Sequence, residues 1–482
     1  MKSFHSTFIA FAALTPFLVA CQSMAPPLPT ASTAPVSAGV VQVWMTAADQ
    51  SKLLSREPDL VLAENASAPT VITVDPAQHY QEIVGFGAAL TDASAWILQN
   101  RMTPAQRKAL LTELFGPAPG LGLSFTRLTI GASDFSNTQY SFDDNPRGGR
   151  DPQLAHFSIE PDRANVLPVV KQMLAINPQL KVMASPWSAP GWMKTSDSLI
   201  GGSLTPESYS AFARYLSRYV GAFAAEGVPI YALTIQNEPH FEPKDYPGMR
   251  VTPQARAVFI GGYLGPLLAE RHPGTRILEW DHNWDEPKSP LAVLADGKAS
   301  RYIAGVAWHC YAGDVSAQGI VHDAYPDKET WLTECSGGEW STWKDSLLWM
   351  ARNLIVGSTR QWAKGVLLWN LALDENHGPH FGGCGNCRAV VTVNSRTGAV
   401  SRNVEYYVLA HASRFVRPGA MRIDSGPPIE GLDNVAFRNS DGTLVLIAVN
   451  AGTEPRPFEV RQGGRAFTDV LPPETLATFV WR

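Results

Sequence analysis

The sequence predicts a (β/α)₈ barrel with a β-sandwich attached to its side. Eight short apolar runs, each able to form a buried parallel strand, follow one another between residues 82 and 372. Most gaps between these runs carry the apolar periodicity of helices, as a barrel of strand-helix units requires. Outside this region, alternating β-like segments occur both before the first run and after residue 411.

The eight expected barrel strands are "EIVGFGAAL" (82–90), "LSFTRLTIG" (123–131), "LKVMASPW" (180–187), "IYALTIQNE" (230–238), "RILEWDHNW" (276–284), "GVAWHCY" (305–311), "TWLTECS" (330–336) and "GVLLWNLA" (365–372). A doubly wound open sheet is the alternative arrangement. That fold would place a glycine-rich phosphate turn after the first strand, and "GFGAALTDA" lacks the G-x-G-x-x-G spacing.

Helix boundaries are marked by capping residues. Thr103, Thr205 and Thr252 each precede a proline at the start of a helical pattern, and Gly116 closes the first of these patterns. We expect Asp92, which follows the first strand, to cap the next helix.

The chain divides into five expected segments. A signal peptide (1–20) is followed by a tether rich in Pro, Ala, Ser and Thr (21–39), N-terminal strands of the sandwich (40–80), the barrel (81–410) and the C-terminal sandwich strands (411–482). "SDGT" between alternating runs predicts a hairpin in the last segment, and the N-terminal strands are expected to join the same sandwich.

The N-terminus has the charge-then-apolar order of a secretory signal, and its apolar stretch is too short to span a bilayer. "LVAC" resembles a bacterial lipobox, which predicts that Cys21 becomes a lipidated first residue, and Gln22 fits the outer-membrane sorting pattern. We therefore expect an outer-membrane lipoprotein facing the periplasm or the cell surface. A plain signal peptide, with release into the periplasm or medium, is the alternative.

Composition narrows the classes of partner. The net charge is −5 and no basic run is present, which argues against a nucleic-acid partner. No second long apolar segment follows the signal, so we expect only the lipid to hold the protein to a membrane. The oligomeric state is not predicted.

Catalytic groups of a barrel lie where its strands end. Carboxylates, amides and aromatic rings occur at those ends, and no cofactor motif accompanies them. Aromatic rings stack on sugar rings, whereas carboxylates and amides bind hydroxyl groups. Two acids, Glu238 and Glu334, end the fourth and seventh apolar runs, and glycoside hydrolysis requires such a pair. We predict that these two glutamates are catalytic.

Several motifs together make the chain resemble glycoside hydrolase family 30. They are "GFGAALTDA", "FTRLTIGASDFS", "ASPWSAPGWMKT", "IQNEP", "WHCY", "TECSGG" and "LLWNLALDENHGPH". The resemblance implies that Glu238 is the acid/base and Glu334 the nucleophile of a retaining, double-displacement enzyme without a cofactor. It also implies a set of residues around the first sugar, namely Arg127, Asp134, Trp187, Asn237, His309, Tyr311 and Trp369.

Two further expectations concern this predicted site. Asn237 is expected to hold the 2-hydroxyl of the sugar, and Arg127 to orient the nucleophile from beneath. Ionised Glu334 is expected to raise the pKa of Glu238, so that Glu238 starts the reaction protonated.

Four cysteines follow the tether. Cys384 and Cys387 have C-x-x-C spacing, for which a small disulfide in an exported chain is a better interpretation than zinc or a redox centre. We expect Cys310 and Cys335 to be buried thiols, and a bond between them stays open. His377 and His380 resemble a metal pair, but no third ligand lies nearby in the sequence, so no metal is predicted.

The resemblance points to β-glucosides as substrates. The loop "GPHFGGCGNCRAVVTV" is more similar to bacterial β-1,6-glucanase and β-glucosidase members than to glucuronoxylanases. A glucosylceramidase is the alternative activity. A surface glycan-binding lipoprotein with an inactive barrel is an alternative of another class, but such a protein would have lost one of the two acids. Exo or endo action is not predicted.

Overall fold

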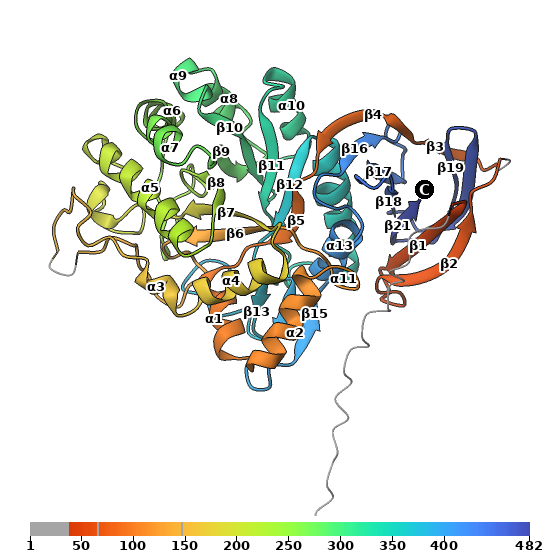
Figure 1. Cartoon of the computed structure of the whole chain (residues 1–482), viewed down its shortest axis with the longest axis horizontal. Helices are drawn as coiled ribbons and strands as arrows, with labels where there is room; N and C mark the ends of the chain where they lie inside the picture. The colour runs from red at the N-terminus through yellow and green to blue at the C-terminus, as the bar shows by residue number, and fades with distance from the viewer. Residues whose placement is uncertain (1–37, 65–66, 146–147) are drawn as a thin grey trace, which may run out of the picture.

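The computed structural model describes residues 38–64, 67–145 and 148–482 (Figure 1). The predicted signal peptide, Cys21 and nearly all of the predicted tether lie outside these residues. Within the described part of the chain, the helices are all too short or too polar to cross a membrane.

Eight parallel strands close into a barrel, as predicted. In chain order they are β5 (Gly85–Ala88), β6 (Phe125–Ile130), β7 (Lys181–Pro186), β8 (Ile230–Thr234), β9 (Arg276–Asn283), β10 (Ile303–His309), β11 (Glu329–Glu334) and β12 (Ala363–Leu368). Each strand overlaps its predicted apolar run. Closure is made by β12, which pairs in parallel with β5.

Helices surround the barrel (Figure 1). They are α1 (Asp92–Asn100), α2 (Pro104–Phe115), α3 (Glu160–Arg163), α4 (Val166–Ile176), α5 (Tyr209–Ala225), α6 (Pro253–Phe259), α7 (Gly265–Arg271), α8 (Lys288–Leu294), α9 (Gly297–Ser300), α10 (Ser316–Ala324), α11 (Trp343–Met350), α12 (Ser358–Arg360) and α13 (Val404–Ser413). Single π-helical segments, η3 (Ile260–Leu264) and η4 (Ala351–Gly357), continue α6 and α11.

Most predicted caps are found. Thr103 forms a capping box with Gln106, and the Thr252 side chain accepts from the third residue beyond it. The Thr205 segment opens with a short 3₁₀ turn, η2 (Pro206–Ser208), before α5 begins. The prediction for Asp92 is wrong: Thr91 caps α1, and the Asp92 carboxylate instead accepts from the backbone N–H of Asn137.

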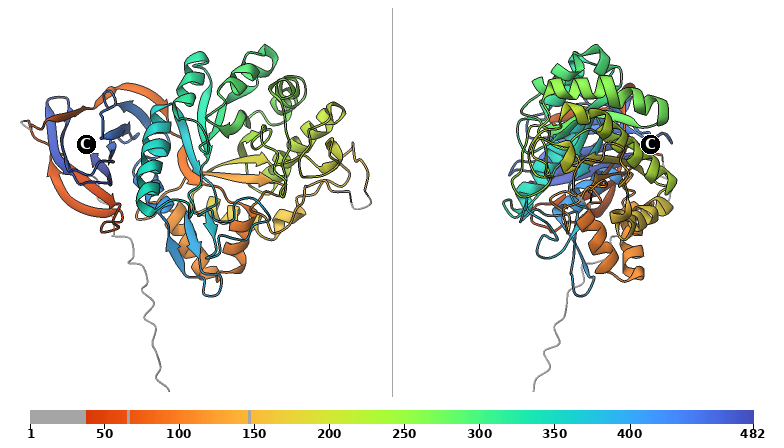
Figure 2. Two further views of the ribbon diagram at one scale, coloured as in Figure 1. Left: turned by 180° about the vertical axis from the view of Figure 1, so that it is seen from behind. Right: turned by 90° about the vertical axis from the view of Figure 1, so that its left-hand side faces the viewer.

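The second part of the molecule is a β-sandwich built from both ends of the described chain (Figures 1 and 2). A seven-stranded sheet has the order β2-β1-β21-β18-β17-β16-β4, and a three-stranded sheet has the order β20-β19-β3. The strands are β1 (Val40–Ala47), β2 (Ser55–Val61), β3 (Thr70–Thr73), β4 (Asp75–Glu82), β16 (Met421–Asp424), β17 (Asp433–Arg438), β18 (Leu444–Asn450), β19 (Arg456–Gln462), β20 (Arg465–Leu471) and β21 (Thr475–Trp481). The predicted union of N- and C-terminal strands is confirmed.

The central strands β18 and β21 of the large sheet are buried on both faces, because they lie between the small sheet and the barrel. In β18, Leu446 belongs to the sandwich core, whereas the next residue, Ile447, belongs to the main core that it shares with the barrel. This alternation explains why "TLVLIAVN" is apolar at almost every position.

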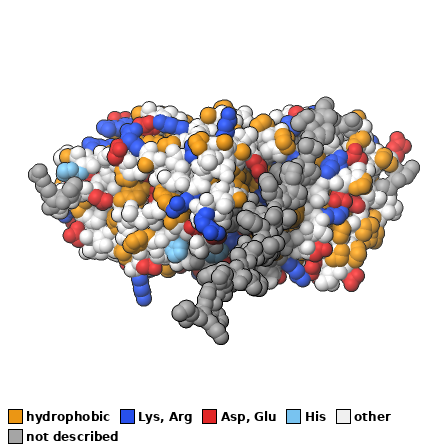
Figure 3. Space-filling view, turned by 90° about the horizontal axis from the view of Figure 1, so that it is seen from below, with side chains coloured by type: hydrophobic (Ala, Val, Ile, Leu, Met, Phe, Trp, Pro, Cys, Tyr) orange, Lys and Arg blue, Asp and Glu red, His pale blue; other side chains and the backbone are white. Residues whose placement is uncertain are grey.

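Acidic and basic side chains are interspersed on the face of the molecule shown in Figure 3.

A small sheet that the sequence analysis missed follows the last barrel strand. It contains β13 (Ala372–Leu373), β14 (Val391–Val393) and β15 (Val400–Arg402). The loop between β13 and β14 carries the C-x-x-C pair. These strands have only two or three residues each, too few to show a period in the sequence.

Candidate active site

A cleft of about 730 Å³ opens at the carboxyl ends of the barrel strands. Seven of the nine residues predicted for the site line it: Asp134, Trp187, Asn237, Glu238, Tyr311, Glu334 and Trp369. The other two, Arg127 and His309, are fully buried and contact the carboxylates from behind. Arg127 thus contacts Glu334 from beneath, as expected. His309, in contrast, was expected beside the sugar, and it lies behind the carboxylates and does not line the cleft.

The backbone leaves the strands in left-handed conformations where the site begins. Glu238 has φ 49°, Asp281 has φ 58° and Asn370 has φ 37°, values that residues other than glycine rarely adopt. The Glu238 N–H donates to the carbonyl of Asp281 at 3.0 Å, and the Asn237 N–H donates to the carbonyl of Pro186 at 2.8 Å. Neighbouring strands thus hold Glu238 in a strained geometry, which is common at functional positions.

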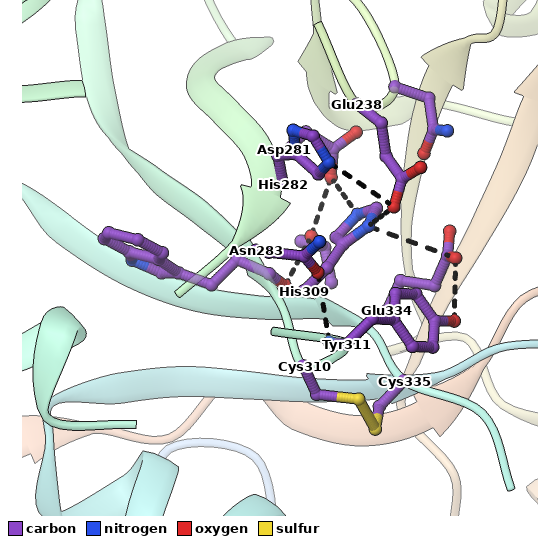
Figure 4. A network of polar contacts seen from close by, with 12 residues as sticks. Glu238, Asp281, His282, Asn283, His309, Cys310, Tyr311, Glu334 and Cys335 are labelled. Carbon is purple, nitrogen blue, oxygen red and sulfur yellow. Dashed lines mark hydrogen bonds and ion pairs between the residues drawn. A yellow bond between two sulfur atoms is a disulfide. The ribbon is translucent and has the colours of Figure 1, made fainter. Parts of the chain in front are cut away.

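Glu334 ends β11 and is held by two donors. Arg127 donates from Nη1 to one carboxylate oxygen. The Tyr311 hydroxyl donates to the other at 2.9 Å, as Figure 4 shows. The same guanidinium donates from Nη2 to the side-chain oxygen of Asn237 at 2.8 Å. This contact leaves the amide nitrogen of Asn237 as the group that can bind a sugar hydroxyl, as predicted for that residue.

Asp281 is the centre of the buried polar network, a role that the sequence analysis did not assign. It is fully buried, and its two carboxylate oxygens accept hydrogen bonds from five side chains, those of Arg127, Ser185, Thr234, His309 and Thr333. Burial alone would raise the pKa of Asp281, but the Arg127 charge and these donors lower it well below its usual range.

His309 joins the two acids of the network. Its Nδ1 lies 3.1 Å from a carboxylate oxygen of Glu238, and its Nε2 lies 3.1 Å from Asp281 (Figure 4). Burial would lower the pKa of His309, but the charges of Glu334 and Asp281 and the hydrogen bonds to Asp281 and Glu238 raise it to about 9. The imidazole is therefore charged at neutral pH and donates to both carboxylates.

The charged imidazole reverses the predicted pKa of Glu238. Burial favours the neutral carboxyl, but the hydrogen bond and charge of His309 outweigh it, so the pKa of Glu238 is lowered. Burial raises the pKa of Glu334, with the charges of His309 and Arg127 opposing it. The expectation that Glu238 has a raised pKa and starts protonated is therefore wrong for the free protein, because the hydrogen bond and charge of His309 outweigh burial and the repulsion between the two carboxylates.

Aromatic rings form the floor and mouth of the cleft. Trp187 and Trp369 stack with ring centroids 5.1 Å apart, and Arg127 lies 4.8 Å from the Trp187 ring. At the mouth, Phe241 and Trp340 line the cleft with about half of their surfaces exposed. Neither mouth residue was predicted, because both lie in loops with no periodicity.

The loop after β13 forms one wall of the cleft. A disulfide joins Cys384 to Cys387, and both residues line the cleft. A side chain at Gly383 would meet Asp134 at 2.6 Å, so this position needs glycine. His377 contacts the carbonyl of Cys387 and the carboxylate of Glu339, each at 3.0 Å. These contacts pack the loop against its neighbours and give His377 partners other than His380.

A second disulfide lies beside the catalytic groups. It joins Cys310 to Cys335, the residues that directly follow His309 and Glu334 (Figure 4). The expectation of buried thiols is therefore wrong, and the bond that had stayed open is present. Parallel strands β10 and β11 are adjacent, which brings residues 25 apart in sequence to a Cα separation of 5.3 Å.

The donor atoms of Glu238, His309 and Glu334 lie within 4.8 Å of one another, close enough to hold a metal ion in principle. Two carboxylates at that spacing can also perform glycoside hydrolysis by themselves. All three residues already have protein partners in the network.

A barrel with paired glutamates at the carboxyl ends of its fourth and seventh strands, over a floor of tryptophan, defines a glycoside hydrolase. The chain belongs to glycosyl hydrolase family 30: residues 83–416 match its TIM-barrel domain and residues 419–479 match its β-sandwich domain. The resemblance drawn from the sequence is thereby confirmed.

Relatives within and near this family include enzymes of two named activities. The chain is 34% identical over 441 residues to "Endo-1,6-beta-D-glucanase neg1" of Aspergillus fumigatus, covering 85% of this chain and 87% of the relative. It is 27% identical to the "Lysosomal acid glucosylceramidase" of Mus musculus, covering 88% and 85%. The solved structure "The endo-beta1,6-glucanase BT3312" superimposes with a TM-score of 0.85 at 35% identity, covering 92% of this chain and 99% of that chain.

Proposed function

We propose that the protein is a retaining β-glycosidase that cleaves β-1,6-glucan or gentio-oligosaccharides, with simple β-glucosides as further substrates. The observation that carries the mechanism is the spacing of the two acids. One carboxylate oxygen of Glu238 lies within 4.8 Å of one of Glu334. Retaining enzymes hold the two carboxyl groups about 5–5.5 Å apart, whereas inverting enzymes separate them by about 6.5–9.5 Å.

In the first step, Glu334 attacks the anomeric carbon while the glycosidic bond breaks and Glu238 protonates the departing oxygen. Arg127 and Tyr311 hold the Glu334 carboxylate so that one oxygen faces the sugar. The amide nitrogen of Asn237 binds the 2-hydroxyl, a contact that strengthens in the transition state.

The proton for this step comes from His309. The raised pKa of His309 keeps the proton on the imidazole, whose Nδ1 lies 3.1 Å from Glu238. A bound sugar removes water from the Glu238 carboxylate, which disfavours its charge, and the proton moves from Nδ1 to the carboxylate. In the second step Glu238 takes a proton from water, which attacks the glycosyl ester and frees Glu334.

The linkage is supported by the relatives. Three relatives, each 34% identical to this chain, bear the name endo-1,6-β-D-glucanase, and the superimposed BT3312 structure bears the same name. The exposed rings of Phe241 and Trp340 offer faces for sugars beyond the catalytic pair.

The test combines stereochemistry and linkage. Proton NMR during cleavage of β-1,6-glucan should show the β-anomer of the new reducing end appearing first, followed by slow mutarotation. Initial release of the α-anomer would exclude the retaining route. Gentiobiose, β-1,6-glucan, β-1,3-glucan, xylan and glucosylceramide should be assayed side by side, and a β-1,6 preference is expected.

A glucosylceramidase is the second candidate, favoured by the relatives of that name and by the apolar rings at the cleft mouth. Faster turnover of glucosylceramide than of gentiobiose in the same panel would establish it over the first candidate. A glycan-binding protein without activity would release no sugar from an aryl β-glucoside.

We also propose that the protein is exported and anchored through a lipid on Cys21. The lipobox supports this location, as do two disulfides in the described chain, since such bonds persist in oxidising compartments. Cys21→Ser should move the enzyme into the soluble fraction without changing its specific activity on small substrates. A wild-type enzyme that is already soluble in the periplasm or medium would contradict the anchor.

A further inference from the structure

The loop that follows β8 brings a second tyrosine into the cleft, in addition to Tyr311. Tyr246 lines the cleft and is half-buried, and its ring packs against the apolar cluster that contains Trp187 and Trp369. These two tryptophans form the floor of the cleft, so Tyr246 adjoins the part in which a sugar would lie. The proposed mechanism gives this residue no role.

The two tyrosine hydroxyls of the cleft differ in their partners. Tyr311 donates to Glu334 at 2.9 Å and so serves the nucleophile. The Tyr246 hydroxyl has no hydrogen-bond partner among the residues that the structure describes, and unlike the Tyr219 hydroxyl it is not enclosed in the protein interior. An accessible and unpaired hydroxyl on a residue that lines the cleft is available to a bound ligand.

The surroundings of Tyr246 make its hydroxyl a hydrogen-bond donor. Burial raises the pKa of Tyr246, and the negative charges of Asp134, Glu238 and Glu334 raise it further. The hydroxyl therefore keeps its proton, and it can donate that proton to a ligand that lies beside the same three carboxyl groups.

Other loops fix the chain on both sides of Tyr246. The carbonyl of Asp245 accepts from the side chain of Gln139 at 3.0 Å, and the Gly248 N–H donates to the carbonyl of Leu199 at 3.0 Å. Gln139 follows β6 and Leu199 follows β7, so loops from two other strands hold this segment. The position of Tyr246 is therefore set before a ligand binds, as a binding group requires.

Asp134 is brought toward the same segment by Gly383. The Gly383 N–H donates to the Asp245 carboxylate at 3.3 Å, and a side chain at Gly383 would meet Asp134 at 2.6 Å. Among the described residues, no side chain donates to the Asp134 carboxyl group, which lines the cleft. Burial raises the pKa of Asp134, and a carboxyl group in either protonation state keeps an oxygen that accepts a hydrogen bond.

We propose that Tyr246 is a substrate-binding residue that, together with Asp134, holds one hydroxyl group of the sugar attacked by Glu334. A sugar hydroxyl both accepts and donates. Its oxygen accepts from the Tyr246 hydroxyl, and its hydrogen is donated to the Asp134 carboxyl group. Since Asn237 is assigned to the 2-hydroxyl, the group held is the 3-, 4- or 6-hydroxyl. This inference rests on the proposed glycosidase function and adds selectivity to it, because an analogue without that hydroxyl leaves two polar groups of the site unpaired.

The test compares Tyr246→Phe with the wild type on nitrophenyl β-glucoside and on its 3-, 4- and 6-deoxy analogues. On the parent glucoside the variant should lose about three- to tenfold in kcat/KM, which corresponds to one neutral hydrogen bond. On the analogue that lacks the bound hydroxyl, the variant and the wild type should be equal. Tyr263→Phe, which alters an exposed tyrosine of η3 outside the cleft, should match the wild type on all four substrates.

A purely structural role predicts a different pattern, because a displaced loop would slow all four substrates by the same factor. That uniform loss, or no loss on any substrate, would overturn the proposal. Asp134→Ala provides a second measurement: its loss of kcat/KM should shrink most on the same deoxy analogue, and the largest reduction on another analogue would contradict the shared hydroxyl. Release of nitrophenol from the parent glucoside tests the glycosidase function, whereas the pattern across the analogues tests Tyr246, so the two proposals can fail separately.

Discussion

The barrel interior contains two layers that differ completely in chemistry and lie only two residues apart. The lower layer is an apolar cluster with one side chain from each of seven strands: Phe125, Met183, Ala232, Leu278, Ala307, Trp331 and Leu367. Two residues further along, five of those strands present polar side chains to the Asp281 network, namely Arg127, Ser185, Thr234, His309 and Thr333. Side chains of a strand alternate between faces, so both layers point into the barrel.

The comparison shows how the polar layer can be held rigidly. A close-packed apolar cluster fixes each strand in position. The next residue of that strand that points into the barrel is thereby fixed as well. The charged side chains of the upper layer are then held within hydrogen-bond distance of one another by the strands, and the loops that follow the strands are not needed to position them. Disrupting the lower layer should therefore affect stability, and disrupting the upper layer should affect chemistry, as the following variants test.

The largest effect is expected for Glu334→Ala. Loss of the nucleophile should reduce kcat by about 10⁴-fold or more. Added azide should restore part of the activity and give an α-glycosyl azide, because azide attacks from the face that Glu334 leaves open. A β-glycosyl azide would show that Glu334 is not the attacking group. Glu270→Ala, at an exposed helix position, is the control.

Glu238→Ala should come next, and its effect should depend on the leaving group. Substrates with alcohol leaving groups need protonation and should slow by about 10²–10⁴-fold, whereas activated aryl glycosides should slow much less. Equal losses on gentiobiose and on a nitrophenyl glucoside would indicate that Glu238 only shapes the cleft.

Asp281→Asn should produce a smaller loss of kcat, on the order of 10²-fold, through misplacement of Arg127 and His309. The change also removes a negative charge that helps to raise the pKa of His309 to about 9. Since the imidazole then loses its proton at lower pH, the alkaline limb of the kcat/KM profile should move to lower pH.

A purely structural role for Asp281 would leave that alkaline limb in place. Ser185→Ala, which removes one of the five donors to Asp281, is the matched control and should shift the profile less.

Leu367→Ala should distinguish the role of the apolar layer in stability from the role of the polar layer in catalysis. This fully buried residue of the apolar cluster lies on β12, two positions before Trp369 in the sequence. Its loss should lower the free energy of unfolding by about 2–5 kcal/mol. Well below the melting temperature kcat should be unchanged, because the polar layer keeps its hydrogen bonds. A kcat loss as large as that of Asp281→Asn would contradict the separation of layers.

Metal removal should have the smallest effect. Exhaustive chelation should leave the rate unchanged, since two carboxylates suffice for the proposed chemistry. A rate that returns only when a divalent ion is added back would assign a metal to the group formed by Glu238, His309 and Glu334.

The barrel and its two glutamates could be predicted from the sequence because both produce local signals. Buried parallel strands appear as apolar runs, and Glu238 and Glu334 lie at the carboxyl ends of two such runs. Thr-Pro pairs marked helix starts for the same reason, through a side chain that bonds a nearby N–H.

The role of Asp281 could not be predicted, because it depends on an irregularity of β9. Simple alternation from Leu278 would point Trp280 into the barrel and Asp281 away from it. Both Trp280 and Asp281 have positive φ, and the pairing of β9 with β10 shifts register there. That distortion turns Asp281 toward Arg127. No periodicity in the sequence reports a change of backbone conformation of this kind.

The bond between Cys310 and Cys335 has a consequence for where active enzyme can be made. It joins the residues that directly follow His309 and Glu334, so the catalytic geometry and the oxidation of two thiols are completed together. In a reducing cytosol these cysteines would stay as thiols, and the ends of β10 and β11 would lack their covalent link. In the exported protein proposed above, this bond would therefore form only after the chain leaves the cytosol.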